Sequence, residues 1–294
     1  MTLRLYLTRL FLATVVCVMA LTAAFAQSVV DDLGREVALD APPTAVVSLL
    51  PSHTETLCAI GACDLIVGID RHSGGEGIQG LPRLGDPYAP DLEAIVALEP
   101  DLVLVDEYSG LHQALQDLGL TVYAGSPQTV GETYAYFATI GTLVDRADEA
   151  EALIARIQGE LASIEAVLEG VERPSVFVEI DPTPFTAGPG SYIHELLVAA
   201  GGENVVPGSL GQFPQVDPEF VVGADPEVIL LLDAPFGVSA QTVGERPGWS
   251  GVTAVRTSRV IEMSQDAADA VSRAGPRLAE AVRVLAQILH PDLF

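Results

Sequence analysis

Short aliphatic runs alternate along this chain with segments whose apolar residues recur every three or four positions. The first pattern predicts buried β-strands and the second predicts amphipathic helices. The strand-like runs are AVVSLL, LIVGI, DLVLV and LTVYA in the first half, and PSVFVEI, EVILLL and RVIEM in the second half. Because strands that alternate with helices form parallel sheets covered on both faces, the pattern predicts an α/β protein.

Helical periodicity fills the intervals between these runs. We expect helices near residues 91–98, 111–118 and 130–144, over the segment SYIHELLVAAGG, and near 276–289. Another helix is expected in PSHTETLCAIG, capped by Ser52 or Thr54 and closed by Gly61.

One longer helix is predicted between the two halves. Apolar residues recur three and four apart from Ala150 to Leu168, without a break until Gly170 and Pro174. This spacing predicts a helix of about 23 residues, roughly 35 Å long, which would act as a strut between two lobes that move little. We therefore divide the chain into a leader (1–26), an N-terminal lobe (27–145), a linking helix (146–172) and a C-terminal lobe (173–294).

One sequence unit occurs twice, as DLEAIVALEPDLVLV at Asp91–Val105 and as DPEFVVGADPEVILL at Asp217–Leu231. Each copy predicts a helix with a glutamate in its first turn, Glu93 or Glu219, followed by a buried strand. A carboxylate is favourable there because it faces the positive end of the helix dipole, so helix stability alone could explain both residues. Two matching acidic points on two matching lobes would also suit a two-fold symmetric partner.

The first 26 residues indicate export. Arg4 and Arg9 precede the apolar run LFLATVVCVMALTAAF, and Ala24-Phe25-Ala26 follows, which is the pattern of a cleaved signal peptide. An uncleaved anchor is disfavoured because the apolar core is shorter than the roughly 20 residues that span a bilayer. Val16 before Cys17 argues against a lipoprotein, and we expect a protein secreted to the periplasm or outside the cytoplasm.

Charge excludes several classes of function. The formal net charge is −26 and every basic residue is an arginine. Such a surface repels nucleic acid and anionic lipid, and the lack of lysine excludes Schiff-base chemistry and the phosphate-binding loop lysine. A local disulfide between Cys58 and Cys63 is one alternative, but we favour Cys58 as a residue on the buried face of a short helix.

Enzyme motifs are weak or missing in the sequence. The segment GEGIQG at Gly75–Gly80 has the glycine spacing of a dinucleotide loop, but Leu81-Pro82 follows where a helix should begin, so we interpret it as a flexible loop. There is no G-x-S-x-G nucleophile motif and no compact zinc-binding pattern. A secreted hydrolase with cleft carboxylates stays the alternative from another class, and we expect no enzyme activity, no cofactor and no resident metal.

Several longer segments resemble one family. VVDDLGREVALDAPPTAVVSLLPSHTETLCAIGACDLIVGI, FTAGPGSYIHELLVAAGGENVV, FPQVDPEFVVGADPEVIL and SRAGPRLAEAVRVLAQ are similar to the substrate-binding proteins of ABC importers for cobalamin, ferric siderophores and haem. The resemblance covers nearly the whole chain after the leader and is strongest to the cobalamin binders in PSHTE, GGENV and FPQVDPE. It implies two Rossmann-like lobes joined by a single long α-helix, with the ligand in the cleft between them. It also implies that Glu93 and Glu219 dock onto arginines of a dimeric permease.

Loops at the carboxyl ends of the predicted strands are the expected lining of that cleft, among them Asp266–Asp269. By this reasoning and by the resemblance, the ligand-binding residues are Ser52, His53, His72, Pro87, Tyr88, Tyr108, Phe185, Phe213 and Asp269. Phe185, Phe213 and Asp269 match cleft positions of the cobalamin binders, whereas His72 and Pro87 stand where those proteins often have aromatics. Trp249 is expected to be a packing residue, and His194 and His290 lie on predicted helices.

The sequence therefore predicts a monomeric, exported binding protein that delivers a corrinoid to an ABC permease, with a ferric siderophore or haem as the alternative cargo.

Overall fold

Two sheets, one in each half of the chain, form the frame of the protein in a computed structural model that describes residues 27–294. The first sheet has the strand order β4-β3-β7-β8 and is parallel throughout. The second has the order β10-β9-β12-β13, with β11 paired to β9, and only β10 in it is antiparallel. The prediction of an α/β fold with parallel sheets is confirmed.

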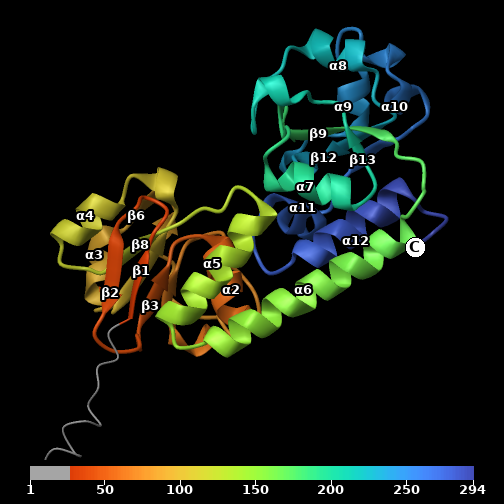
Figure 1. Cartoon of the computed structure of the whole chain (residues 1–294). Coiled ribbons are helices and arrows are strands. Elements are labelled where there is room, and N and C mark those ends of the chain that lie inside the picture. Colours follow the sequence, from red (N-terminus) through yellow and green to blue (C-terminus); the bar gives the residue numbers. More distant parts are fainter. Residues whose placement is uncertain (1–26) are drawn as a thin grey trace, which may run out of the picture.

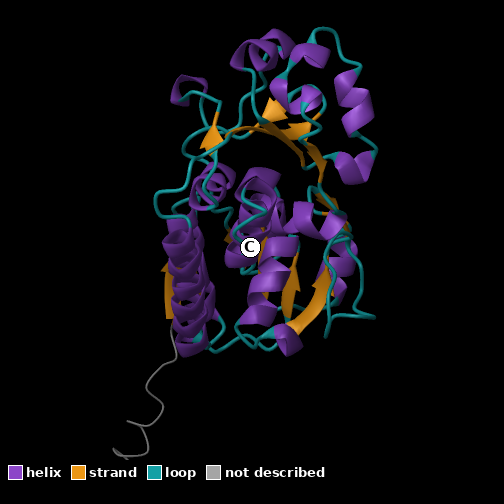
Figure 2. Cartoon of the chain, turned by 90° about the vertical axis from the view of Figure 1, so that its right-hand side faces the viewer, coloured by secondary structure: helices purple, strands orange, loops and turns teal. Residues whose placement is uncertain are grey.

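The N-terminal lobe contains the first sheet and the helices that cover it (Figure 2). Its sheet strands are β3 (Val46–Ser48), β4 (Ile66–Ile69), β7 (Leu102–Val105) and β8 (Val122–Ala124), and its hairpins are β1 (Gln27–Val30) with β2 (Glu36–Leu39) and β5 (Gly85–Asp86) with β6 (Ala89–Pro90). Its helices are α2 (Pro51–Ala59), α3 (Leu92–Ala97), α4 (His112–Asp117) and α5 (Val130–Leu143), with 3-10 turns η1 (Cys63–Leu65) and η2 (Glu107–Ser109). The helices expected near 91–98, 111–118 and 130–144 are confirmed.

The C-terminal lobe repeats this plan, with α8, α9 and α10 on one face of its sheet and α7, α11 and α12 on the other (Figure 1). Its strands are β9 (Ser175–Asp181), β10 (Phe185–Thr186), β11 (Glu203–Asn204), β12 (Val228–Leu231) and β13 (Val260–Glu262). Its helices are α7 (Tyr192–Ala199), α8 (Pro218–Ala224), α9 (Ala240–Gly244), α10 (Thr253–Arg256), α11 (Gln265–Ser272) and α12 (Leu278–Leu289), with 3-10 turns η3 (Gly208–Leu210), η4 (Ala234–Phe236) and η5 (Trp249–Gly251).

The continuous apolar strands are explained by burial on both faces. All four residues of β12 are buried, and their side chains alternate between two clusters. Ile229 and Leu231 pack with Trp249, whereas Val228 and Leu230 pack with α7 and α12 on the other face. The prediction that Trp249 is a packing residue is confirmed. It is fully buried and lies edge-on to Phe177, with 6.4 Å between the ring centroids.

Helix α6 (Ala147–Val167) is the predicted strut. Its 21 residues make it about 32 Å long. It runs from the N-terminal lobe to the C-terminal lobe along one side of the molecule and packs against α5 and α12 (Figure 1). The apolar cluster that holds Ile157 and Ile164 of this helix also contains side chains from both sheets, so one core is shared by the two lobes.

The doubled sequence unit is also doubled in structure. Asp91 caps α3 by accepting a hydrogen bond from Ala94 N at 3.0 Å, and Asp217 caps α8 by accepting one from Glu219 N at 2.8 Å. Each helix is followed by a residue with positive φ, Glu99 at 47° and Asp225 at 46°. The acidic residues that follow Pro100 and Pro226 also play the same part in the two lobes. Asp101 accepts a hydrogen bond from Thr44 N, and Glu227 accepts one from Ser175 N.

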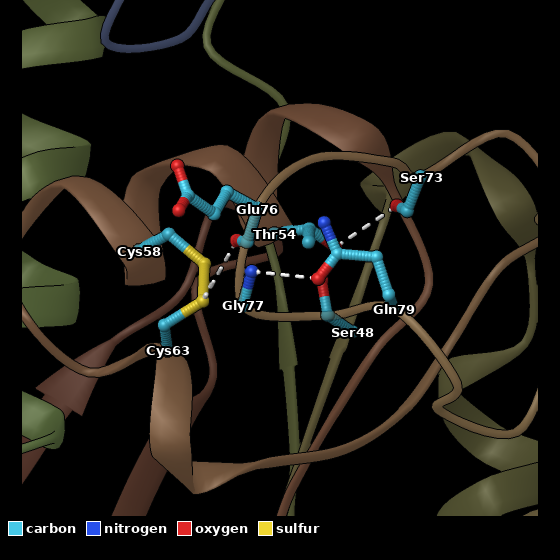
Figure 3. The surroundings of a disulfide bond; sticks show 8 residues. All are labelled: Ser48, Thr54, Cys58, Cys63, Ser73, Glu76, Gly77 and Gln79. Atoms are coloured by element: carbon cyan, nitrogen blue, oxygen red, sulfur yellow. Dashed lines mark hydrogen bonds between the residues drawn. A yellow bond between two sulfur atoms is a disulfide. The ribbon is translucent and has the colours of Figure 1, made fainter.

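Three local expectations were wrong. Helix α2 begins after Leu50 without a side-chain cap, because the Thr54 hydroxyl turns inward to Ser48 and Ser73. Asp266–Asp269 is not a loop but part of α11, which Ser264 caps. Cys58 is disulfide-bonded to Cys63, and the bridge closes the turn between α2 and η1 beside the loop of Glu76 and Gly77 (Figure 3).

The predicted signal peptide, residues 1–26 with Cys17, lies outside the described residues. Within residues 27–294, none of the helices has the length and apolar character needed to cross a bilayer.

Candidate ligand-binding cleft

A cavity of about 280 Å³ lies where the two lobes meet. From the N-terminal lobe it is lined by residues at the start of α2 and at the carboxyl ends of the strands, including Ser52, Tyr88, Asp106, Ser126, Pro127 and Gln128. From the C-terminal lobe it is lined by Tyr192, Phe213, Ser272, Arg273 and Ala274. Ser52, Tyr88 and Phe213 were among the residues predicted from the sequence to bind ligand.

Aromatic side chains from both lobes form the apolar part of this cavity. Tyr88 is 53% exposed, and its hydroxyl donates to the Asp106 carboxylate at 3.0 Å. Burial and then Asp106 raise the pKa of Tyr88 to about 12, so it stays a neutral hydrogen-bonding phenol at physiological pH. On the opposite lobe, the rings of Tyr192 and Phe213 lie 6.3 Å apart.

Polar contacts hold the lobes together around the cavity. Tyr192 N donates to Gln128 O at 2.6 Å, and Val130 N donates to the Glu195 carboxylate at 2.7 Å. Both bonds join the entrance of α5 to α7 in the other lobe. These bonds fix the relative position of the two walls at this point.

An arginine inside the cavity links the lobes a second time. Arg273 forms an ion pair with Glu55 of α2 and another with Asp269, at 2.9 Å, on its own lobe. Burial raises the pKa of Glu55, and the charge of Arg273 opposes that rise. Asp269, which was expected to touch ligand, therefore positions Arg273 and is not itself part of the lining.

The structure places the other predicted ligand residues outside the cavity. His53 has no exposed surface: its Nε2 bonds Gly125 O at 2.9 Å, its ring stacks on Tyr136, and burial lowers its pKa to about 4. The prediction that His53 contacts ligand is therefore wrong, because α2 turns this side chain into the core.

The remaining four residues differ in their surroundings. His72 is exposed and accepts a hydrogen bond from Arg71 Nε at 2.9 Å, whereas Pro87 is buried. Phe185 is half-buried on the edge strand β10 of the C-terminal lobe. Tyr108 is 68% exposed and lines a different cavity.

Sequence reasoning missed several lining residues. Asp106 directly follows the buried strand β7, so the rule that sites lie at the carboxyl ends of strands could have identified it. Arg273 and Tyr192 gave no such signal, because each becomes part of the cavity through a contact between the lobes, with Glu55 and with Gln128 O respectively.

Glu93 and Glu219 occupy equivalent places on the two lobes. Both are exposed in the first turns of α3 and α8, next to the capping aspartates. Figure 1 shows α3 and α8 in different lobes, each on a part of its lobe remote from α6. Neither carboxylate has a hydrogen bond or ion pair from its side chain within the described part of the chain, so both are free to meet a partner.

A two-lobed α/β frame with one bridging helix and a cavity between the lobes is the architecture of a solute-binding protein. Residues 46–267 match the model of the family described as "Periplasmic binding protein", and the chain belongs to that family. It is 31% identical over 285 residues to an uncharacterized ABC transporter substrate-binding lipoprotein, YvrC, of Bacillus subtilis, covering 93% of this chain and 88% of the relative.

Other relatives carry more specific names. A cobalamin-binding protein of Halobacterium salinarum is 26% identical over 278 residues, covering 88% of this chain and 73% of that protein. Among solved structures, the periplasmic vitamin B12 binding protein BtuF of Vibrio cholerae has a TM-score of 0.69 at 22% identity, covering 84% of this chain and 97% of that one. The heme-binding protein RhuT of Roseiflexus sp. has a TM-score of 0.73 at 24% identity, covering 85% and 99%. These two structures show the shared fold.

The family membership decides the general function. The protein is a substrate-binding component of an ABC transporter, so its partners are a small-molecule ligand and a membrane permease. It is a carrier and not an enzyme, which excludes the secreted hydrolase, and the molecule in the cleft is transported cargo and not a cofactor. Its relatives are periplasmic or lipoprotein forms.

Proposed function

We propose that this protein binds a corrinoid between its lobes and delivers it to a dimeric ABC permease. The observation that carries the proposal is the pairing of aromatic side chains from opposite lobes, Tyr88 on one side and Phe213 with Tyr192 on the other, across one cavity. Aromatic rings offer flat apolar area to a macrocycle. The cobalamin-binding relative supports the same cargo.

Polar groups at the edge of the cavity suit the amide side chains of a corrinoid. Ser52, Ser126 and Gln128 can donate and accept hydrogen bonds with carboxamides, and the Asp106 carboxylate can accept from them. Nothing in this set requires the cargo to carry net charge.

The size of the cavity implies movement of the lobes. At about 280 Å³ it is just smaller than the roughly 300 to 1,000 Å³ typical of ligand pockets. A macrocycle therefore needs the lobes to separate at the Glu55–Arg273 pair, or has to extend outward over the exposed ring of Tyr88. Ligand would then favour one relative position of the lobes over another.

A ferric siderophore or haem is the alternative cargo, and Arg273 is the feature that favours it. A guanidinium in the cleft pairs well with the carboxylates that haem and many iron chelates carry. Two acids already hold this arginine, however, and the raised pKa of Tyr88 disfavours a phenolate that could ligate ferric iron.

Calorimetric titration with cyanocobalamin, hemin and a ferric catecholate tests the cargo directly. We expect one cyanocobalamin per chain, with at least about tenfold weaker binding in Tyr88→Ala and in Phe213→Ala because each removes buried aromatic area. Tyr108→Ala is the matched control, since that ring lies outside the cavity, and its affinity should not change. Absence of heat and of any spectral change with cyanocobalamin would refute the corrinoid; binding of hemin or the catecholate alone would select the alternative.

We propose further that Glu93 and Glu219 form the permease contact, on a protein that a cleaved signal peptide directs out of the cytoplasm. The double variant Glu93→Arg/Glu219→Arg should abolish uptake in reconstituted vesicles while ligand affinity in solution is unchanged. Glu149→Arg/Glu151→Arg on α6 has the same charge change and should transport normally. Equal loss of transport in both double variants would contradict docking through α3 and α8.

A further inference from the structure

A second cavity, of about 480 Å³, lies within the N-terminal lobe beside the cleft. It is lined by residues from the end of β1, from β8, from the turn η2 and from α5 as far as Thr139. Three carboxylates line it, those of Asp32, Glu107 and Glu132, and no basic side chain is among the described residues of its lining. The cavity therefore has a strong negative potential that no residue of its own wall balances.

Local backbone bonds position two of these acids. Asp32 Oδ2 accepts a hydrogen bond from Ser126 N at 2.9 Å, and Glu132 Oε2 accepts from Gln128 N at 2.8 Å and from Thr129 N at 3.1 Å. In both Asp32 and Glu132, only one of the two carboxylate oxygens accepts these bonds. The geometry thus holds the acids in place and leaves further lone pairs for a ligand.

The pKa shifts of Asp32 and Glu107 agree with the lack of a basic side chain in the lining. Burial is the main cause that raises the pKa of Asp32, and Asp31 and Glu132 raise it further. Burial also raises the pKa of Glu107; a hydrogen bond from Tyr108 opposes that rise, and the charges of Asp32, Asp106 and Glu132 add to it. A cation in the cavity would reverse these shifts, because an opposite charge favours the ionised form.

A tyrosine hydroxyl in the wall gives independent evidence for an absent partner. Tyr136 is 3% exposed, and its buried hydroxyl makes no hydrogen bond within the described structure. Burial is the main cause that raises the pKa of Tyr136, and its neighbours Tyr123 and Asp32, which line the same cavity, raise it further, so its hydroxyl stays neutral. Buried hydroxyls are normally paired, so an unpaired one that lines an acidic cavity points to a donor supplied by a ligand.

We propose that this cavity binds the alkylammonium group of a small organic cation. An ammonium has three N–H donors, which match the free carboxylate oxygens and the Tyr136 hydroxyl as an acceptor. The ring of Tyr108 supplies a face for a cation at the mouth of the cavity. A bare metal ion fits less well, because no group of three or more potential ligands among the described residues is arranged to hold one.

The cavity is distinct from the cleft, although Ser126 and Gln128 line both. The two cavities also differ in charge. Arg273 lines the cleft, whereas the charged residues that line this cavity are all acidic. The inference therefore does not depend on which cargo the cleft carries, and an amine here would lie next to the entrance of α5 that joins the two lobes.

Titration of the full protein with 1,4-diaminobutane at low salt tests the proposal. We expect one saturable site, about tenfold weaker binding in Glu107→Gln through loss of a charge-assisted hydrogen bond, and weaker binding at higher ionic strength. Tyr136→Phe should weaken binding but not destabilise the protein, since it removes a hydroxyl with no partner. The hexamethylated diamine, whose two quaternary ammonium groups have no N–H donors, should bind less well.

Glu151→Gln on the exposed face of α6 is the matched control, because it makes the same charge change away from the cavity. If the diamine binds this variant as weakly as it binds Glu107→Gln, attraction to the net charge explains the binding and the site is refuted. Undiminished binding to both Glu107→Gln and Tyr136→Phe, or no saturable binding to the natural protein, would refute it equally. A crystal soaked with the diamine should show its nitrogen within hydrogen-bond distance of Asp32 or Glu107.

Discussion

Asp233 is the buried acid whose replacement should stabilise the protein. It is 3% exposed at the end of β12, and neither of its oxygens has a hydrogen-bond partner among the described residues. Beside it lies Glu179, which is fully buried and paired with Arg246 through two bonds of 2.5 and 2.7 Å. Burial, followed by the charge of Glu179, raises the pKa of Asp233 from 3.8 to about 7, with Arg246 opposing the rise.

The sign of the effect on stability follows from that rise. Below pH 3.8 Asp233 is protonated in both folded and unfolded chains, and its ionisation has no influence. As the pH increases toward 7, the unfolded chain ionises while the folded chain stays protonated, so the free energy of unfolding falls. Each pKa unit corresponds to about 1.4 kcal/mol, so above pH 7 the ionised acid costs the folded state roughly 4 kcal/mol.

Asp233→Asn keeps the shape of the side chain and removes this cost. We expect the variant to be more stable than the natural protein at pH 8 by about 2 to 4 kcal/mol, with an advantage roughly 2 to 3 kcal/mol smaller at pH 5. Urea denaturation at both pH values measures the difference. Asp64→Asn, an exposed acid on η1, is the control for a general charge effect. An Asp233→Asn protein with no gain at pH 8, or with the same gain at both pH values, would refute the reasoning.

Three further predictions concern stability and use the same denaturation assay. Trp249→Ala should destabilise the protein by about 3 to 5 kcal/mol, because it empties a fully buried site and removes the ring under Arg246; a loss below 1 kcal/mol would contradict this. Cys58→Ser should cost about 2 kcal/mol through loss of a short cross-link, and a reductant should weaken only the natural protein. Asp91→Ala and Asp217→Ala should each cost about 1 kcal/mol, and clearly unequal losses would show that the two caps differ in strength.

The pattern of apolar residues predicted the frame of the protein because each lobe is built from local units. The aliphatic runs became the buried strands β7 and β12, and the three-and-four spacing up to Leu168 became α6. The two copies of the doubled unit each formed the predicted helix and buried strand, and they also share caps that the sequence analysis did not predict.

The cleft was harder to predict because its wall comes from residues far apart in the chain. The sequence identified Tyr88 and Phe213 from their loop positions, but Arg273 belongs to the cavity through its pairing with Glu55, more than 200 residues earlier. His53 was misjudged for the opposite reason: a polar residue at a helix start resembles a site residue, yet its backbone partner, Gly125, lies in a distant loop of the core.

The apolar core that runs through both sheets and α6 also limits how the molecule can be divided. A chain cut after α5 or after α6 would leave aliphatic side chains such as Ile157 and Ile164 exposed to water. Such half-molecules should aggregate when made separately, although each contains a whole sheet. Chimeras that exchange one half with a relative would need to exchange the matching surface of α6 as well.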